Sequence, residues 1–109
     1  MLHEMKLKES PFERIKSGTK TIEFRLFDEK RQKIKVGDKI EFSKLPDLKE
    51  KLLVKVIQLY REDTFENLFR KLYDDEEEIK RKTNSMLQFY SPEEEKEYGV
   101  IGIKISLVS

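Results

Sequence analysis

The residues with the clearest chemical potential lie in an eight-residue segment from Gly18 to Arg25. Two cationic side chains, Lys20 and Arg25, flank the carboxylate of Glu23. Lysine and arginine bind anionic groups, and a carboxylate accepts hydrogen bonds from amino groups. The segment therefore indicates a site for an anionic, hydrogen-bonding ligand such as a nucleotide. The alternative is a solvated strand face on which Glu23 and Arg25 form a surface ion pair worth less than about 1 kcal/mol.

The elements that position this segment are a helix before it and a strand within it. Gly18 suits the left-handed position after a helix, where the missing Cβ removes a steric cost. The next residues alternate as in a β-strand, which separates a polar face from an apolar face. The polar face is predicted to hold Thr21, Glu23 and Arg25, and the apolar face Ile22, Phe24 and Leu26.

Further candidate ligand contacts lie outside this segment. The charged turn that follows contributes Lys30 and Arg31. Tyr90 and Tyr98 could stack on a base of single-stranded RNA, as aromatic side chains do. For both tyrosines, the favoured interpretation is packing with a satisfied hydroxyl group.

Composition narrows the class of protein. The 109 residues suit a single domain spanning residues 1–109. No cysteine is present, which excludes disulfides, thiolate nucleophiles and zinc–cysteine sites. The only histidine, His3, is expected at the surface or on an edge strand. We expect no cofactor and no metal, and we interpret the acidic run at residues 74–78 as part of a solvated helix or ordered loop.

Charge and hydropathy bear on partners and location. The net charge is +1, but residues 1–60 carry +5 and residues 61–109 carry −4. This asymmetry is compatible with a local phosphate-binding face and does not suggest strong non-specific DNA binding. No apolar run approaches the roughly 20 residues that span a bilayer. We therefore expect a soluble, cytoplasmic protein with no membrane partner; the oligomeric state is not predictable.

Turn and cap residues set the expected order of elements. A strand at residues 1–7 precedes a short helix that begins at the capping box Ser10-Pro11-Phe12-Glu13. Thr64 is expected to cap an amphipathic helix, and Ser91 to cap a short one that ends near Gly99. Four further strands are expected at residues 20–26, 39–42, 52–60 and 100–108.

This order predicts an α+β fold. The absence of regular βαβ alternation favours a small, curved, mixed or antiparallel β-barrel flanked by short helices. Its core is expected to include seven apolar residues, namely Ile22, Phe24, Ile40, Val54, Val56, Ile101 and Ile103.

The pattern Gly-x-Lys-x-x-Glu-x-Arg, formed by Gly18, Lys20, Glu23 and Arg25, resembles the signature of ASCH domains. The flanks are also similar: a Pro-Phe helix before it, a Gly-Asp turn into Ile-x-Phe after it, and a terminal Tyr-Gly-Val-Ile-Gly-Ile strand. The resemblance covers nearly the whole chain. It implies a PUA-like barrel with a cleft, lined by the signature, that binds RNA or a nucleotide-like ligand.

Whether the protein is an enzyme is left open by this resemblance. One ASCH branch hydrolyses N4-acetylcytidine with a lysine, a threonine and a glutamate. The lysine matches Lys20, but the threonine position holds Glu23, and the branch's glutamate has no identified match. Other members are described as ribonucleases. The alternative function is therefore a small hydrolase acting on single-stranded RNA or a modified nucleoside, with Lys20 and Glu23 as the catalytic pair.

Overall fold

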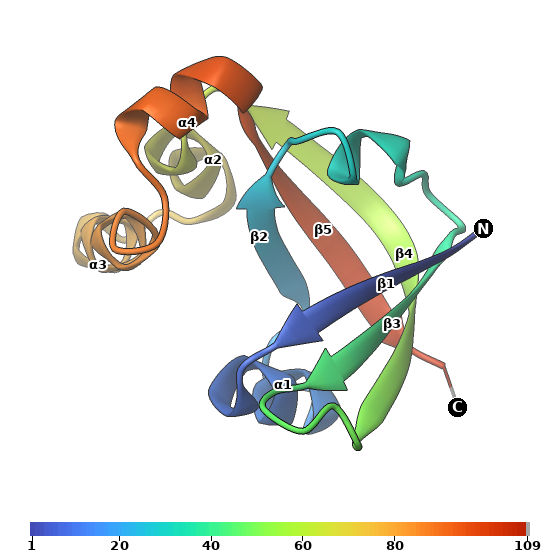
Figure 1. The fold of residues 1–109 in the computed structure, drawn as a ribbon. Helices are drawn as coiled ribbons and strands as arrows, with labels where there is room; N and C mark the ends of the chain where they lie inside the picture. The colour runs from blue at the N-terminus through green and yellow to red at the C-terminus, as the bar shows by residue number, and fades with distance from the viewer. Residues whose placement is uncertain (109) are drawn as a thin grey trace. The chain divides into compact units, whose positions relative to one another are not determined.

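The computed structural model describes residues 1–108 of the chain (Figure 1). Five strands and four α-helices follow one another, with a short 3-10 helix, η1, between β2 and β3. In chain order the elements are β1 (Leu2–Leu7), α1 (Glu9–Lys16), β2 (Ile22–Leu26), η1 (Arg31–Lys33), β3 (Lys39–Lys44), β4 (Lys51–Glu62), α2 (Phe65–Leu72), α3 (Glu76–Met86), α4 (Pro92–Tyr98) and β5 (Val100–Leu107).

All five strands belong to one mixed sheet with the order β1-β3-β4-β5-β2. The pairing of β1 with β3 is parallel and places His3 opposite Ile40, whereas β3 and β4 are antiparallel and place Ile40 opposite Val54. The α+β class and the mixed sheet confirm the fold prediction and are consistent with a PUA-like architecture. The four strands expected after the first helix lie in this sheet within a few residues of their predicted bounds.

The chain divides into two compact units, each made of separate segments. The first unit comprises residues 1–23, 34–59 and those from 103 onwards, and the second comprises residues 24–33 and 60–102. In the first unit, β1 buries every second side chain, while α1 buries Phe12 and Ile15 on one face. Its other buried apolar residues are Met5, Leu7, Ile34, Ile40, Phe42, Val54, Val56, Ile103 and Ile105.

Charged side chains attach α1 to β3 in the first unit. The Lys44 ammonium group lies 3.0 Å from a carboxylate oxygen of Glu13 and 2.9 Å from one of Glu50. Lys16, at the end of α1, pairs with the other oxygen of Glu50 at 2.6 Å. Hydrogen bonds from the two lysines lower the pKa of Glu50. The helix that precedes the Gly18 turn is therefore fixed by polar contacts as well as by its apolar face.

The second unit is built around aromatic side chains. Phe24 meets Phe69 edge to face at 4.8 Å between ring centroids, a geometry that aromatic pairs favour. Phe65 lies near Phe69 on α2, at 6.3 Å. The other buried apolar residues of this unit are Leu26, Leu68, Ile79, Val100 and Ile101. Of the seven predicted core residues in the chain, all are buried except Ile22, which is half-buried.

The cap predicted at Ser10 is wrong. Helix α1 begins at Glu9, and its N-cap, Lys8, makes no side-chain capping hydrogen bond. Ser10 and Pro11 instead occupy the first turn, where proline is tolerated because N–H groups there lack intrahelical partners. By contrast, Thr64 and Ser91 are caps as predicted, and Ser91 forms the complete capping box with Glu94. In the acidic run at residues 74–78, the helix α3 begins at Glu76.

His3 lies on the edge strand β1, which agrees with the expected surface or edge-strand position. Its side chain shares the buried face of β1, and its Nε2 atom is 2.8 Å from Oδ2 of Asp38. The alternation of β1 turns this side chain inward, where Asp38 supplies a polar partner.

Candidate functional site

The turn before β2 fixes the backbone of Lys20. Gly18 adopts a φ of +84°, as predicted for the residue after a helix, and its N–H donates to the carbonyl of Ile15. The N–H of Lys20 then reaches back to the carbonyl of Arg14 at 3.0 Å. A Cβ at Gly18 would meet no atom within 4 Å, so the glycine is required for its backbone conformation and not for space.

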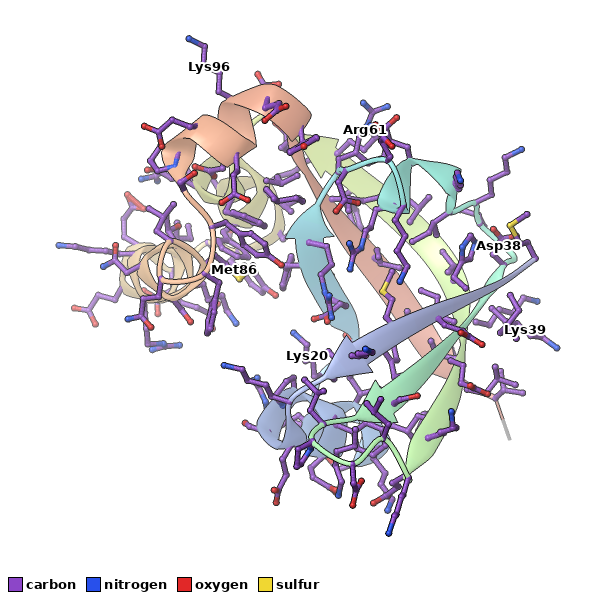
Figure 2. All side chains as sticks on the ribbon, in the orientation of Figure 1. Lys20, Asp38, Lys39, Arg61, Met86 and Lys96 are labelled. Carbon is purple, nitrogen blue, oxygen red and sulfur yellow. The ribbon has the colours of Figure 1, made fainter. Side chains whose placement is uncertain are left out.

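Lys20 and Glu23 form the central pair of the candidate site. The Lys20 ammonium group lies 3.4 Å from a carboxylate oxygen of Glu23, and their side chains are 16% and 7% exposed. Both residues belong to the first unit (Figure 2 labels Lys20). Burial of a carboxylate is costly unless a cation or hydrogen-bond donors compensate it. The pair is therefore a largely desolvated arrangement of a cation and an anion, and the side chain of Lys20 is more exposed than that of Glu23.

The burial of Glu23 argues against the alternative in which the polar face of β2 is merely solvated. The burial pattern of Ile22–Leu26 is half-buried, buried, buried, half-buried, buried. Glu23 is thus covered like its neighbour Phe24, and one of its carboxylate oxygens faces the Lys20 ammonium group. Arg25 is half-buried on the same strand and lies in the second unit.

The other predicted contacts also fall in the second unit. Lys30 is exposed, whereas Arg31 in η1 is bound to its own turn: its Nη1 atom donates to Asp28 at 2.9 Å. The Nε atom of Arg31 is buried without a hydrogen-bond partner in the described residues. Tyr90 stacks on Phe65 with 5.6 Å between ring centroids, which agrees with the packing interpretation.

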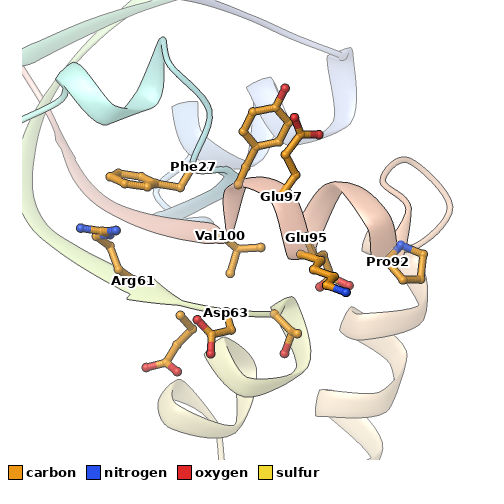
Figure 3. A pocket seen from close by; sticks show the side chains of 12 residues that line it. Phe27, Arg61, Asp63, Pro92, Glu95, Glu97 and Val100 are labelled. Atoms are coloured by element: carbon orange, nitrogen blue, oxygen red, sulfur yellow. The ribbon is translucent and has the colours of Figure 1, made fainter.

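A pocket of about 740 Å³ in the second unit was not anticipated from the sequence (Figure 3). Its lining comes from Phe27, the end of β4, the two residues that precede α2, helix α4 and the start of β5. The Arg61 guanidinium lies over the Phe27 ring at 3.8 Å from the centroid. No local spacing links residues so distant in the chain, so no signal in the sequence could have revealed this contact. None of the signature residues lines this pocket.

Metal-ligating clusters and membrane-spanning helices are two further features to consider. Among residues 1–108, no group of three or more metal-ligating side chains is arranged to hold a metal ion. None of the helices in that range is both long and apolar enough to cross a membrane. The side chains of Lys20 and Glu23 are capable of hydrogen bonding, charge pairing and proton transfer.

Comparison with known proteins adds a family and two structures. The family model described as the ASCH domain matches residues 5–109. The crystal structure of hypothetical protein PH0355 is 37% identical in sequence, covers 99% of this chain and 100% of its own, and has a TM-score of 0.83. The solution NMR structure of protein PF0455 from Pyrococcus furiosus is 36% identical in sequence and has a TM-score of 0.73. The match covers 100% of this chain and 99% of PF0455. No curated protein matches the chain.

Proposed function

Since this chain belongs to the ASCH domain family, we propose that it is an RNA- or nucleotide-binding module whose ligand contacts the signature segment. The observation that carries the proposal is the Lys20–Glu23 pair, whose carboxylate is buried beside an amine that keeps some exposure to solvent. The proposal includes the cytoplasmic location and the single domain expected from composition and length.

Energetics support a functional role for this pair. A buried ion pair is weak support for stability, because apolar residues of similar volume often stabilise as well or better. In the proposed complex the Lys20 amine contacts a phosphate or the edge of a base. Glu23 holds this amine in place or accepts a hydrogen bond from an exocyclic amino group of the ligand.

The remaining candidate contacts stay predictions from the sequence: one from the signature, two from the charged turn after it and one from an aromatic ring. These are Arg25, Lys30, Arg31 and Tyr90. Arg31 already donates a hydrogen bond to Asp28. One face of the Tyr90 ring already stacks on Phe65. A contribution from Arg31 or Tyr90 would therefore require these contacts to be shared with the ligand.

Fluorescence anisotropy with short single-stranded RNAs, and NMR titration with nucleotides, test the proposal. Lys20→Gln should weaken binding by roughly tenfold, because one charge-assisted contact is lost. Lys55→Gln is the matched control, since Lys55 is an exposed lysine of β4 in the same unit. It should leave the affinity almost unchanged. Equal affinities of the wild type and Lys20→Gln for every ligand would contradict the proposal.

The alternative function, hydrolysis of single-stranded RNA or a modified nucleoside, is favoured by the same geometry. A carboxylate can move a proton while a neighbouring ammonium group stabilises charge on a reacting phosphate. Turnover assays on RNA distinguish the two functions, because a binding module leaves its ligand intact. Any activity must disappear in Lys20→Gln and persist in Lys55→Gln, which excludes a contaminating nuclease.

A further inference from the structure

The exposed face of the sheet in the first unit places two lysines directly opposite each other. Lys39 of β3 pairs in register with Lys55 of β4, and Leu2 of β1 lies opposite Lys39 on its other side. All three side chains are exposed, whereas the adjacent residues Ile40 and Val54 are buried (Figure 2 labels Lys39). The row of Leu2, Lys39 and Lys55 therefore points away from the core of this unit.

The two ammonium groups of this row have no compensating charge. Directly opposed residues of antiparallel strands have Cβ atoms about 4.5–5.5 Å apart, and like charges in this position are destabilising. Neither Lys39 nor Lys55 forms an ion pair within residues 1–108. A carboxylate or phosphate that binds at the two lysines would relieve their repulsion.

The carboxylates of the same face do not neutralise these lysines. Glu4 and Glu41 lie opposite each other, two residues further along β1 and β3. Glu41 pairs with Lys51 of β4 at 3.4 Å, and Glu4 forms no ion pair in the part of the chain that the structure describes. The face thus has two unpaired cations in one row and carboxylates in the next.

Aliphatic side chains border the two lysines. Leu2 is 53% exposed. Ile57 follows Lys55 by two residues on the same face of β4 and is 46% exposed, and Leu53 precedes Lys55 by two residues and is half-buried. Grouped apolar side chains that are exposed and bordered by polar residues mark interaction sites.

The composition of this face favours a protein partner over RNA or a membrane. Single-stranded RNA is bound by stacking on aromatic side chains, and these five residues include none. A continuous phosphate backbone would also meet the carboxylates of Glu4 and Glu41. Anionic membranes attract clusters of about four to eight basic residues, without interspersed carboxylates.

The position of the strands determines which element of a partner fits. Both β3 and β4 have a strand on each side, so their backbones cannot pair with a further strand. A helix covers the face of a sheet through its side chains. We propose that this face docks an acidic amphipathic helix of a partner protein. Its carboxylates contact Lys39 and Lys55, and its aliphatic side chains cover Leu2 and Ile57.

Fluorescence anisotropy at fixed ionic strength tests this proposal with a labelled synthetic peptide, whose leucines and glutamates give a helix one apolar and one acidic face. Lys39→Gln/Lys55→Gln should weaken saturable binding by at least roughly tenfold, because both charged contacts are lost. The matched control is Lys49→Gln/Lys80→Gln, which removes the same charge from exposed lysines outside the strands. If the first double variant fails to fold in a thermal melt, its two single variants provide the comparison.

Other probes distinguish other occupants. The same peptide with glutamine in place of every glutamate should bind at least roughly tenfold more weakly. Lys39→Gln/Lys55→Gln should leave unchanged the affinity for single-stranded RNA and for vesicles of phosphatidylcholine and phosphatidylserine.

Four results would each overturn the proposal. These are no saturation by the glutamate peptide, equal binding of the glutamine peptide, an equal loss in the control double variant, and a loss of RNA or vesicle binding in Lys39→Gln/Lys55→Gln. The last result would identify a surface for phosphates. Because the surface includes neither Lys20 nor Glu23, its failure would not affect the proposed function.

Discussion

At the scale of single residues, the spacing of the signature identified Lys20 and Glu23 but not their environment. Alternation along a strand placed Glu23 on a polar face opposite the apolar one, either as part of a ligand site or as a solvated surface residue. Alternation describes the two faces of a strand, but tertiary packing decides whether both are covered. In the structure Glu23 is 5% exposed, and one of its carboxylate oxygens lies 3.4 Å from the Lys20 ammonium group. A surface ion pair is therefore not an adequate description of this carboxylate.

Glu23 leads to a prediction about catalysis. The purified protein should release no acetate from N4-acetylcytidine, because the position that matches the family's threonine holds a carboxylate in place of a hydroxyl nucleophile. Acetate release can be followed by NMR, with Glu23→Thr as the comparison. Robust release by the wild type would show that another group, such as Thr21 or a water molecule, performs the attack.

At the scale of elements, helix caps separate what local sequence determines from what it does not. The motif at Ser91 has the same Ser-Pro-x-Glu pattern as the motif at Ser10. Only the motif at Ser91 forms a capping box. Helix α1 begins one residue before Ser10, after β1 has ended at Leu7. Local propensity allows both starting points, and the position of the preceding strand selects between them.

These two serines provide a matched pair of variants. Ser91→Ala should lower the free energy of unfolding by about 1 kcal/mol, because the N–H of Glu94 loses its capping acceptor. Ser10→Ala should have little effect or stabilise slightly, since alanine is the better helix former inside the first turn. Urea unfolding followed by circular dichroism measures both. Equal losses would mean that the capping bond of Ser91 does not contribute to stability.

At the scale of the whole molecule, the sequence predicted the fold class, one sheet containing the expected strands, and most of the core. It did not predict that β1 pairs in parallel with β3, or the contacts of His3 with Asp38 and of Arg61 with Phe27. These contacts join residues more than 30 positions apart, and nothing in their local spacing requires them. Periodicity identifies elements, whereas the choice of partner depends on the assembled chain.

The contact between His3 and Asp38 predicts how stability depends on pH. Hydrogen bonds from His3 and from the N–H of Lys35 lower the pKa of Asp38 from 3.8 to about 2. A carboxyl group with a lowered pKa in the folded state stabilises the fold above its unfolded pKa, and this contribution is lost as pH falls toward the folded pKa. Stability from Asp38 should therefore decrease between about pH 4 and pH 2.

Thermal melts across this pH range measure the effect. Asp38→Asn should flatten the acid limb of the stability profile, while Asp74→Asn, at an exposed aspartate of the second unit, should leave the limb unchanged. An identical acid limb in the wild type and in Asp38→Asn would rule out this contribution.

The most direct test of the central claim is a titration of the isotope-labelled protein with a short single-stranded RNA, followed residue by residue in amide NMR spectra. If the signature binds the ligand, the largest saturable shifts should occur at Gly18, Lys20 and Glu23, and Lys20→Gln should reduce them. The absence of saturable shifts at these three residues, or shifts confined to the pocket near α4, would contradict the assignment of the Lys20–Glu23 pair as the ligand site.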